Sequence, residues 1–152
     1  MSKFSREEAK RLLELLEQET GIFERVLKLT ESQTAFVNAE DMDALNESLD
    51  QRQGFIEEID GLHQETQVLM QSYISYSSSS SGKKLAALDA AEAKLRGLIE
   101  ACSELNEKNN VLAKEKAGNI AQRIGKLSTS RKSINSYIQG VAGGSELFDK
   151  MT

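Results

Sequence analysis

Apolar residues, with a few threonines among them, recur along this chain with the spacing of a helix that packs in a coiled coil. Between residues 9 and 37 they follow one another at alternating steps of four and three, which is a heptad repeat. The same spacing continues between residues 42 and 73, and it begins again at Leu85. The sequence contains no proline, the residue that most strongly ends a helix. The pattern therefore predicts an all-α fold built from three long helices.

Polar and small residues mark where these helices begin and end. Ser5 and Glu8 have the S-x-x-E spacing of a capping box, which starts the first helix. Asn38 or Asp41 can cap the second helix. A run of serines then favours a loop, because serine side chains compete for helical backbone hydrogen bonds. A single helical domain over residues 1–152 follows, with helices at about 5–37, 41–74 and 83–139 and a Ser-rich loop at 75–82.

The apolar spacing of the third helix changes near Gly118. Up to Ala113 it follows the heptad, and the next step, to Ala117, is an additional four. Such a stutter locally unwinds a supercoil, and glycine weakens a helix. We therefore expect a break near residue 118, between a part that belongs to a bundle and an amphipathic C-terminal arm at residues 119–141.

The connections fix how the helices are arranged. Short connections make consecutive helices antiparallel neighbours, so position x of the second helix lies opposite about 159 − x of the third. Met42 then falls near Ala117, and roughly 20 residues of the third helix, about 30 Å, have no partner of matching length in the chain. The predicted fold is an elongated antiparallel three-helix bundle or coiled coil. Its long C-terminal helix extends past the bundle or folds back on it.

An extended arm exposes an apolar stripe to water. Such a stripe has to be covered by the bundle, by a second copy or by a partner. Anchors at i, i+3 or i+4 and i+7 are an ordinary way for one helix to recognise another. The candidate partner-binding residues are Ile120, Ile124, Leu127, Ile134, Ile138 and Val141.

One seam position carries a charge, Arg52. In the predicted register it lies opposite Asn106, Glu107 and Asn109 of the third helix. A buried arginine needs such partners, because leaving it unpaired costs several kcal/mol. We expect these four residues to form a structural polar layer that fixes the helix register. A ligand-binding Arg52 is the alternative.

Charge is distributed unevenly. Residues 1–104 carry 11 basic and 20 acidic side chains, whereas residues 105–139 carry seven basic and two acidic ones. The basic C-terminal half of the third helix indicates a partner-facing end, with an ordinary solvated helix face as the alternative. It does not predict nucleic-acid binding, because the whole protein is acidic and only Tyr137 interleaves with these cations.

No motif in the sequence has the residue types and spacing of a catalytic site. The single histidine, His63, and the single cysteine, Cys102, both fall on apolar seams and read as packed structural residues. No metal-ligand spacing and no phosphate-binding loop is present. We therefore expect no enzyme, no catalytic residue, no metal site and no cofactor. No apolar run of about 18 residues and no signal peptide is found, which predicts a cytoplasmic protein without membrane insertion.

Several sequence features follow one another along the chain, and their order and spacing can be compared with those of a known family. They are Leu12-Leu13-x-x-Leu16 with Glu19, the acidic break Glu40-Asp41 followed by Leu45 and Leu49, Arg52 with Ile56 and Ile59, Leu105-Asn106 and Asn109-Asn110, and Tyr137 before a glycine-rich end with Leu147-Phe148-Asp149. In these features, over nearly its whole length, the chain resembles the FlgN family of flagellar export chaperones. It departs from the family in its serine tract and in a tail without the usual tyrosine-aspartate ending.

That resemblance implies a small cytoplasmic chaperone of the flagellar type III export system. Such a protein binds the helical C-terminal regions of the two hook–filament junction proteins, which are hook-associated proteins, and passes them to the export apparatus. The resemblance places substrate binding on the C-terminal helix, at Ile120, Ile124, Leu127, Ile134 and Ile138, and requires no cofactor. The alternative is a coiled-coil structural or adaptor protein that self-associates, as a homodimer, through the same helix.

Overall fold

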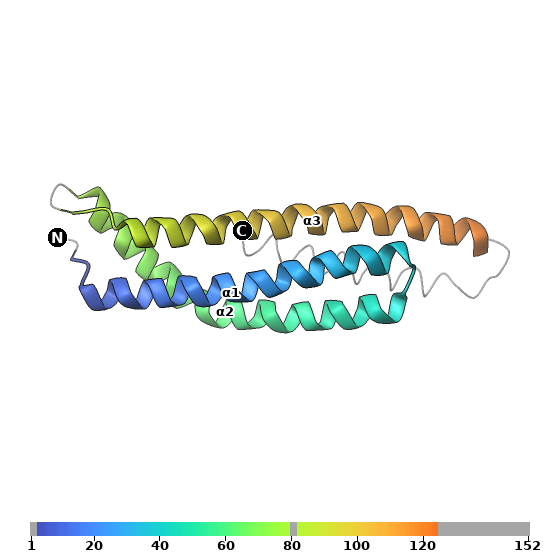
Figure 1. Cartoon of the computed structure of the whole chain (residues 1–152), viewed down its shortest axis with the longest axis horizontal. Helices are drawn as coiled ribbons and strands as arrows, with labels where there is room; N and C mark the ends of the chain where they lie inside the picture. Colours follow the sequence, from blue (N-terminus) through green and yellow to red (C-terminus); the bar gives the residue numbers. More distant parts are fainter. Residues whose placement is uncertain (1–2, 80–81, 125–152) are drawn as a thin grey trace.

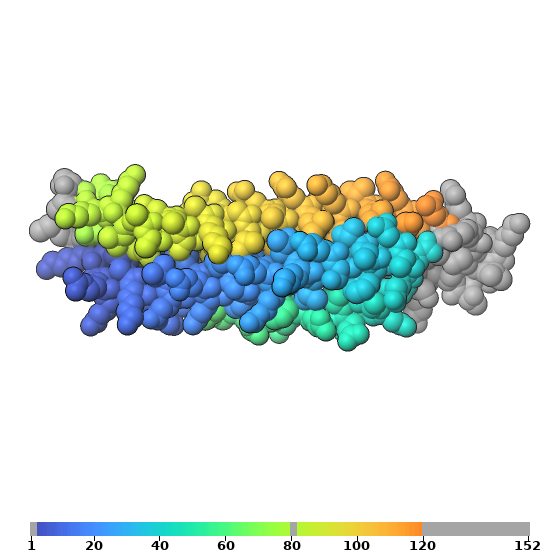
Figure 2. Space-filling view, in the orientation of Figure 1, coloured from blue at the N-terminus to red at the C-terminus, as the bar shows by residue number. Residues whose placement is uncertain are grey.

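The computed structural model describes residues 3–79 and 82–124. They form three helices, α1 (Arg6–Asn38), α2 (Met42–Ser78) and α3 (Ala86–Ile124). Helix α2 returns antiparallel to α1, and α3 runs parallel to α1 along the same long axis (Figure 1). The described residues contain no strand. The all-α three-helix bundle predicted from the apolar spacing is confirmed, and Figure 2 shows its elongated outline.

The start of α1 is fixed by the capping box. The Ser5 hydroxyl accepts a hydrogen bond from the Glu8 backbone N–H at 3.0 Å, and the Glu8 carboxylate accepts one from the Ser5 N–H at 3.2 Å. These bonds satisfy two donors that a helix N-terminus otherwise leaves free. Just before the cap, the ring of Phe4 lies 5.4 Å from that of Tyr73 and 5.9 Å from that of Tyr76, centroid to centroid. The first turn of α1 is thereby packed against the end of α2.

The turn between α1 and α2 is a Schellman motif without a glycine. The Asp41 N–H donates to the Phe36 carbonyl at 2.9 Å, and the Glu40 N–H donates to the Val37 carbonyl at 3.1 Å. Glu40 has a φ of 56°, a left-handed conformation in which glycine is usual. The Asp41 side chain then accepts from the Ala44 N–H at 3.1 Å and caps α2. The reversal is therefore complete within a few residues.

Helix α2 continues to Ser78, four residues beyond the end predicted from the serines. The serine hydroxyls bond back to carbonyls of the same helix, Ser77 to Ile74 at 3.2 Å and Ser79 to Tyr76 at 2.7 Å. Tyr76 also packs against the core. Tertiary packing thus overrides the weak helix propensity of serine over this turn.

The interior has two apolar parts. The larger core contains Leu12, Leu16, Phe23, Ile59 and Leu95 among its buried residues and fills the half of the bundle that holds the N-terminus. The smaller one, which we call the tip cluster, lies at the α1–α2 turn. Its buried members are Val37, Leu45, Ala113 and Ala117, with Phe36, Met42, Leu49 and Leu112 packed around them.

Helix α1 is the central element of this packing. Its Cα atoms come within 8 Å of Cα atoms in both other helices, whereas within the described residues no Cα of α2 comes that close to one of α3. Leu12 and Leu15 are therefore completely buried, while Leu13 and Leu27, which the heptad places on the seam, are half-buried. A helix that contacts two neighbours needs an apolar face wider than one seam.

Helix α3 is continuous through Gly118, so the expected break near residue 118 does not interrupt it. A glycine within a helix costs only about 1 kcal/mol relative to alanine, and a stutter changes supercoiling without removing hydrogen bonds. Because Val37 and Leu45 pack with Ala113 and Ala117, the remainder of α3 extends beyond the end of α1 (Figure 1). The seven residues from 118 to 124 correspond to about 10 Å.

Candidate functional site

The predicted partner-binding residues are only partly described. The backbone of Ile120 and Ile124 lies in the last described turns of α3, past the tip cluster. Their side chains lie outside the description, as do all atoms of the other four predicted residues, Leu127, Ile134, Ile138 and Val141. Helix α3 therefore carries the beginning of the predicted stripe out of the bundle.

Arg52 lies between the two apolar parts. Its side chain is 1% exposed, and its Nη1 donates to Oε1 of Gln33 at 2.8 Å and to Oδ1 of Asn106 at 2.7 Å. Burial lowers the pKa of the guanidinium from its ordinary value to about 10, because desolvation disfavours the charged form. Arg52 thus links α2 to both other helices at one level of the bundle.

Asn109 extends this polar region between α1 and α3. Its Nδ2 donates to the Thr30 carbonyl at 2.9 Å, and its Oδ1 accepts from the Thr34 hydroxyl at 2.6 Å. Glu107 is exposed. The structure therefore brings Arg52 to Asn106 and places Asn109 beside them against α1, but it leaves Glu107 on the surface.

Sequence reasoning missed two buried polar residues of α1. Gln33 is 2% exposed and Glu19 is 1% exposed. Both belong to a second row of residues seven apart, Leu12, Glu19, Val26 and Gln33, which is buried over its whole length. A search for apolar spacing alone passes over this row, because half of its members are polar. The row itself, with the period of a heptad, was the available signal.

Glu19 meets the only histidine of the chain. Its Oε1 lies 3.1 Å from Nδ1 of His63, which joins α1 to α2. Its Oε2 is buried and has no hydrogen-bond partner among the described residues. The His63 side chain is 43% exposed, so the pair lies at the edge of the interior.

Cys102 is completely buried, and its thiol donates to the Phe23 carbonyl at 3.7 Å. Burial raises the pKa of this thiol from 9.0 to about 11, which outweighs the opposite effect of the nearby Arg52 cation. A reactive cysteine needs an accessible thiolate, so this environment favours an inert structural residue.

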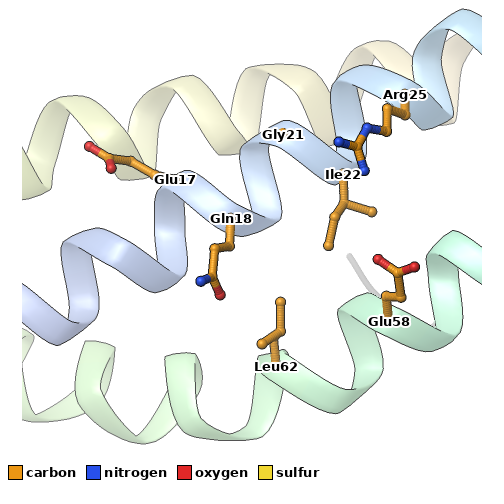
Figure 3. A pocket seen from close by; sticks show the side chains of 7 residues that line it. All are labelled: Glu17, Gln18, Gly21, Ile22, Arg25, Glu58 and Leu62. Carbon is orange, nitrogen blue, oxygen red and sulfur yellow. The ribbon is translucent and has the colours of Figure 1, made fainter.

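A hollow of about 390 Å³ lies on the outer side of the α1–α2 pair (Figure 3). It occurs where Gly21 has no side chain, since a Cβ atom there would meet nothing within 4 Å. Its other lining residues are Glu17, Gln18, Ile22, Arg25, Glu58 and Leu62. Acidic, basic and apolar side chains are mixed around it, without the nucleophile–base pair or metal-ligand set that chemistry would need.

No group of three His, Cys, Asp or Glu side chains among the described residues could hold a metal ion. No helix in the described ranges is long and apolar enough to cross a membrane. Fold and site together define an elongated bundle of three long helices that extends one helix beyond the others.

A family model described as FlgN protein matches residues 1–140. The chain therefore belongs to the FlgN family, and it is a flagellar export chaperone. The resemblance in the order and spacing of its sequence features is thus confirmed. Neither a search of curated proteins nor a search of solved structures finds a match.

Proposed function

We propose that this chaperone acts in the cytoplasm and captures the helical C-terminal regions of hook–filament junction proteins. Capture occurs on the apolar stripe formed by Ile120, Ile124, Leu127, Ile134, Ile138 and Val141. Substrates bound in this way stay soluble and unassembled until they are passed to the export apparatus. No cofactor takes part.

The observation that supports this proposal is the projection of α3. The tip cluster ends at Ala117, where α1 and α2 reverse, while α3 continues to Ile124. The backbone of α3 at Ile120 and Ile124, where the stripe begins, therefore lies beyond the level at which α1 and α2 reverse. A substrate helix can cover the stripe through i, i+3/i+4 and i+7 contacts.

A truncation that ends the chain at Gly118 tests the placement of the binding region. Both apolar parts of the described interior lie before this residue, so the truncated protein should keep its helical circular dichroism spectrum. It should lose calorimetrically detectable binding to a purified C-terminal fragment of a hook–filament junction protein. Binding with unchanged affinity would place the substrate on the bundle instead.

Paired charge substitutions test the face. Ile124→Asp with Leu127→Asp puts two carboxylates into the stripe and should weaken substrate binding at least 100-fold, because about 3 kcal/mol of apolar contact is lost. Gln122→Asp with Thr129→Asp adds the same charge outside the stripe and should change affinity less than threefold. Equal losses in both pairs would show that charge, not apolar contact, governs binding.

The second candidate is a structural or adaptor protein whose arm self-associates into a homodimer. The same projecting helix end favours it, since a second copy can cover the stripe as well. Sedimentation equilibrium over a wide concentration range separates the two. A monomer that binds the substrate fragment supports capture, and a tight dimer that Ile124→Asp dissociates supports self-association.

A further inference from the structure

The tip of the α1–α2 hairpin has a one-sided charge. From residue 29 to residue 51 the sequence contains six carboxylates and no lysine or arginine. From residue 116 to residue 145 it contains five cations and no carboxylate. Because α3 passes the hairpin tip on its way to Ile124, the structure puts the beginning of the cationic segment at the carboxylate-rich end of the bundle (Figure 1). The six carboxylates are Glu31, Glu40, Asp41, Asp43, Glu47 and Asp50.

Apolar side chains accompany these carboxylates on α2. Met42 and Leu49 pack on the tip cluster but remain half-buried, and they lie seven residues apart, on one face of the helix. Asp43 and Asp50, each the next residue in the chain, are exposed. This edge of α2 thus offers an apolar row flanked by negative charge.

Helix α3 lies across from this edge of α2. No Cα of α2 lies within 8 Å of one of α3 in the described ranges, and side chains such as Arg52 bridge the two helices. Asn110 follows Asn106, which meets Arg52 of α2, by one helical turn and is 7% exposed. Its Oδ1 accepts no hydrogen bond from any described residue.

The length of the C-terminal segment fits this surface. The hydrogen bonds Arg52–Asn106 and Tyr73–Leu85 put Met42 level with about residue 116 of α3, and Leu49 with about residue 109. Glycine readily adopts the left-handed conformation that ends a helix, so Gly125 is a position at which the chain can reverse. A helix that reverses there brings Ile134 to about the level of Met42 and Val141 to about that of Leu49.

We propose that, without substrate, residues 131–141 dock back on the hairpin tip of their own chain. In this masked state Ile134, Ile138 and Val141 cover Met42 and Leu49, and Arg131 and Lys132 face the tip carboxylates. Residues 131–141 are covalently connected to the hairpin of the same chain, which gives them an effective concentration in the millimolar range. They therefore compete for this surface more strongly than a second copy does. Substrate displaces the segment, so masking regulates the capture site proposed above and rests on that proposal.

Disulfide trapping tests the docking itself, with no substrate present. In a Cys102→Ala background, Met42→Cys with Ile134→Cys should form an intramolecular disulfide under mild oxidation, seen as faster migration of the monomer on a non-reducing gel. Glu57→Cys with Ile134→Cys is the matched control, about 20 Å further along α2, and should not cross-link. A disulfide found only in dimers would assign the surface to a second copy and overturn the proposal, as would equal trapping in both pairs.

Charge reversal tests the regulation. Asp43→Lys, Glu47→Lys and Asp50→Lys together should abolish the trapped disulfide and raise the affinity for the hook–filament junction fragment about tenfold, if about nine molecules in ten are masked. Glu57→Lys, Glu58→Lys and Asp60→Lys make the same charge change in mid-helix and should alter neither. If the triple lysine variant at the tip still forms the disulfide between positions 42 and 134, the proposal is overturned. If the disulfide forms but the protein does not bind the hook–filament junction fragment, the proposed capture is refuted and the docking is not.

Discussion

Burial of the Arg52 guanidinium costs desolvation free energy that its hydrogen bonds to Gln33 and Asn106 offset. These bonds connect all three helices at the boundary between the large core and the tip cluster. An apolar side chain at this position would pack in more than one register, whereas the arginine is satisfied only where both amide oxygens are within reach. We therefore interpret the polar layer as the feature that selects one alignment of the helices.

Arg52→Ala should lower the free energy of unfolding by about 3–5 kcal/mol, because two buried amide oxygens lose their donor and a large volume is vacated. Urea unfolding followed by circular dichroism measures this. Arg52→Met combined with Gln33→Leu and Asn106→Leu should recover most of the loss, since the whole network becomes apolar. A single variant as stable as the wild type would show that the arginine contributes nothing to the interior.

Ionisation of the Cys102 thiol makes the free energy of unfolding depend on pH, and the sign of this dependence follows from the pKa shift. In the unfolded chain it ionises near 9.0, whereas in the folded protein it stays protonated up to about pH 11. Between these values the unfolded state releases the proton first, so stability falls as the pH rises. The wild type should therefore lose more unfolding free energy between pH 9 and 11 than Cys102→Ala. Parallel curves for the two proteins would mean that the thiol is not desolvated.

At the residue scale, a contact could be predicted from the sequence where a buried side chain has a strong physical requirement. A charge on an apolar seam needs partners, which pointed from Arg52 to Asn106. Sequence reasoning did not find Gln33 or Glu19, because a polar residue on a helix between two neighbours looks like solvent-facing surface. Only the positions of both neighbouring helices show that this second row is enclosed.

The turn between α1 and α2 depends on one residue in a costly conformation. Glu40 has a φ of 56°, and a non-glycine residue there costs roughly 1 kcal/mol. Glu40→Gly should raise the unfolding free energy by about that amount. Glu47→Gly, within α2, should lower it by about 1 kcal/mol, because glycine weakens a helix interior. Thermal unfolding of both variants checks the opposite signs, and destabilisation by both would show that the side chain of Glu40 matters more than its backbone.

At the element scale, the helix starts that depend on nearby residues could be predicted from the sequence. The helix ends and the turn that depend on tertiary packing could not. The capping box at Ser5 follows from residues a few positions apart, so sequence alone shows it, whereas sequence left Asn38 and Asp41 open as the cap of α2 and the structure selects Asp41. The end of α2 and the continuity of α3 at Gly118 depend on packing and on small propensity costs that long helices absorb. The turn at Glu40 lacks the glycine that would have marked it.

At the scale of the whole molecule, the described residues form a large apolar core at one end, a polar layer in the middle and a small cluster at the other end. Two of the four buried members of the tip cluster are alanines, Ala113 and Ala117. Alanine buries little apolar surface, so this end is held less firmly than the half that contains Phe23 and Leu95. It is also the end from which α3 projects, which is where a binding protein needs its helices to adjust.

Matched Leu→Ala variants on either side of the polar layer test this gradient. Each should cost about 2–5 kcal/mol locally, since Leu16 and Leu45 are both 2% exposed. Leu16→Ala should accelerate hydrogen exchange in all three helices, because the large core is needed for global stability. Leu45→Ala should accelerate it mainly in residues 33–49 and 108–119, which can open while the rest stays folded. If Leu45→Ala accelerates exchange equally in residues 88–102, the bundle opens as one cooperative unit. The polar layer then does not divide it into two parts that open independently.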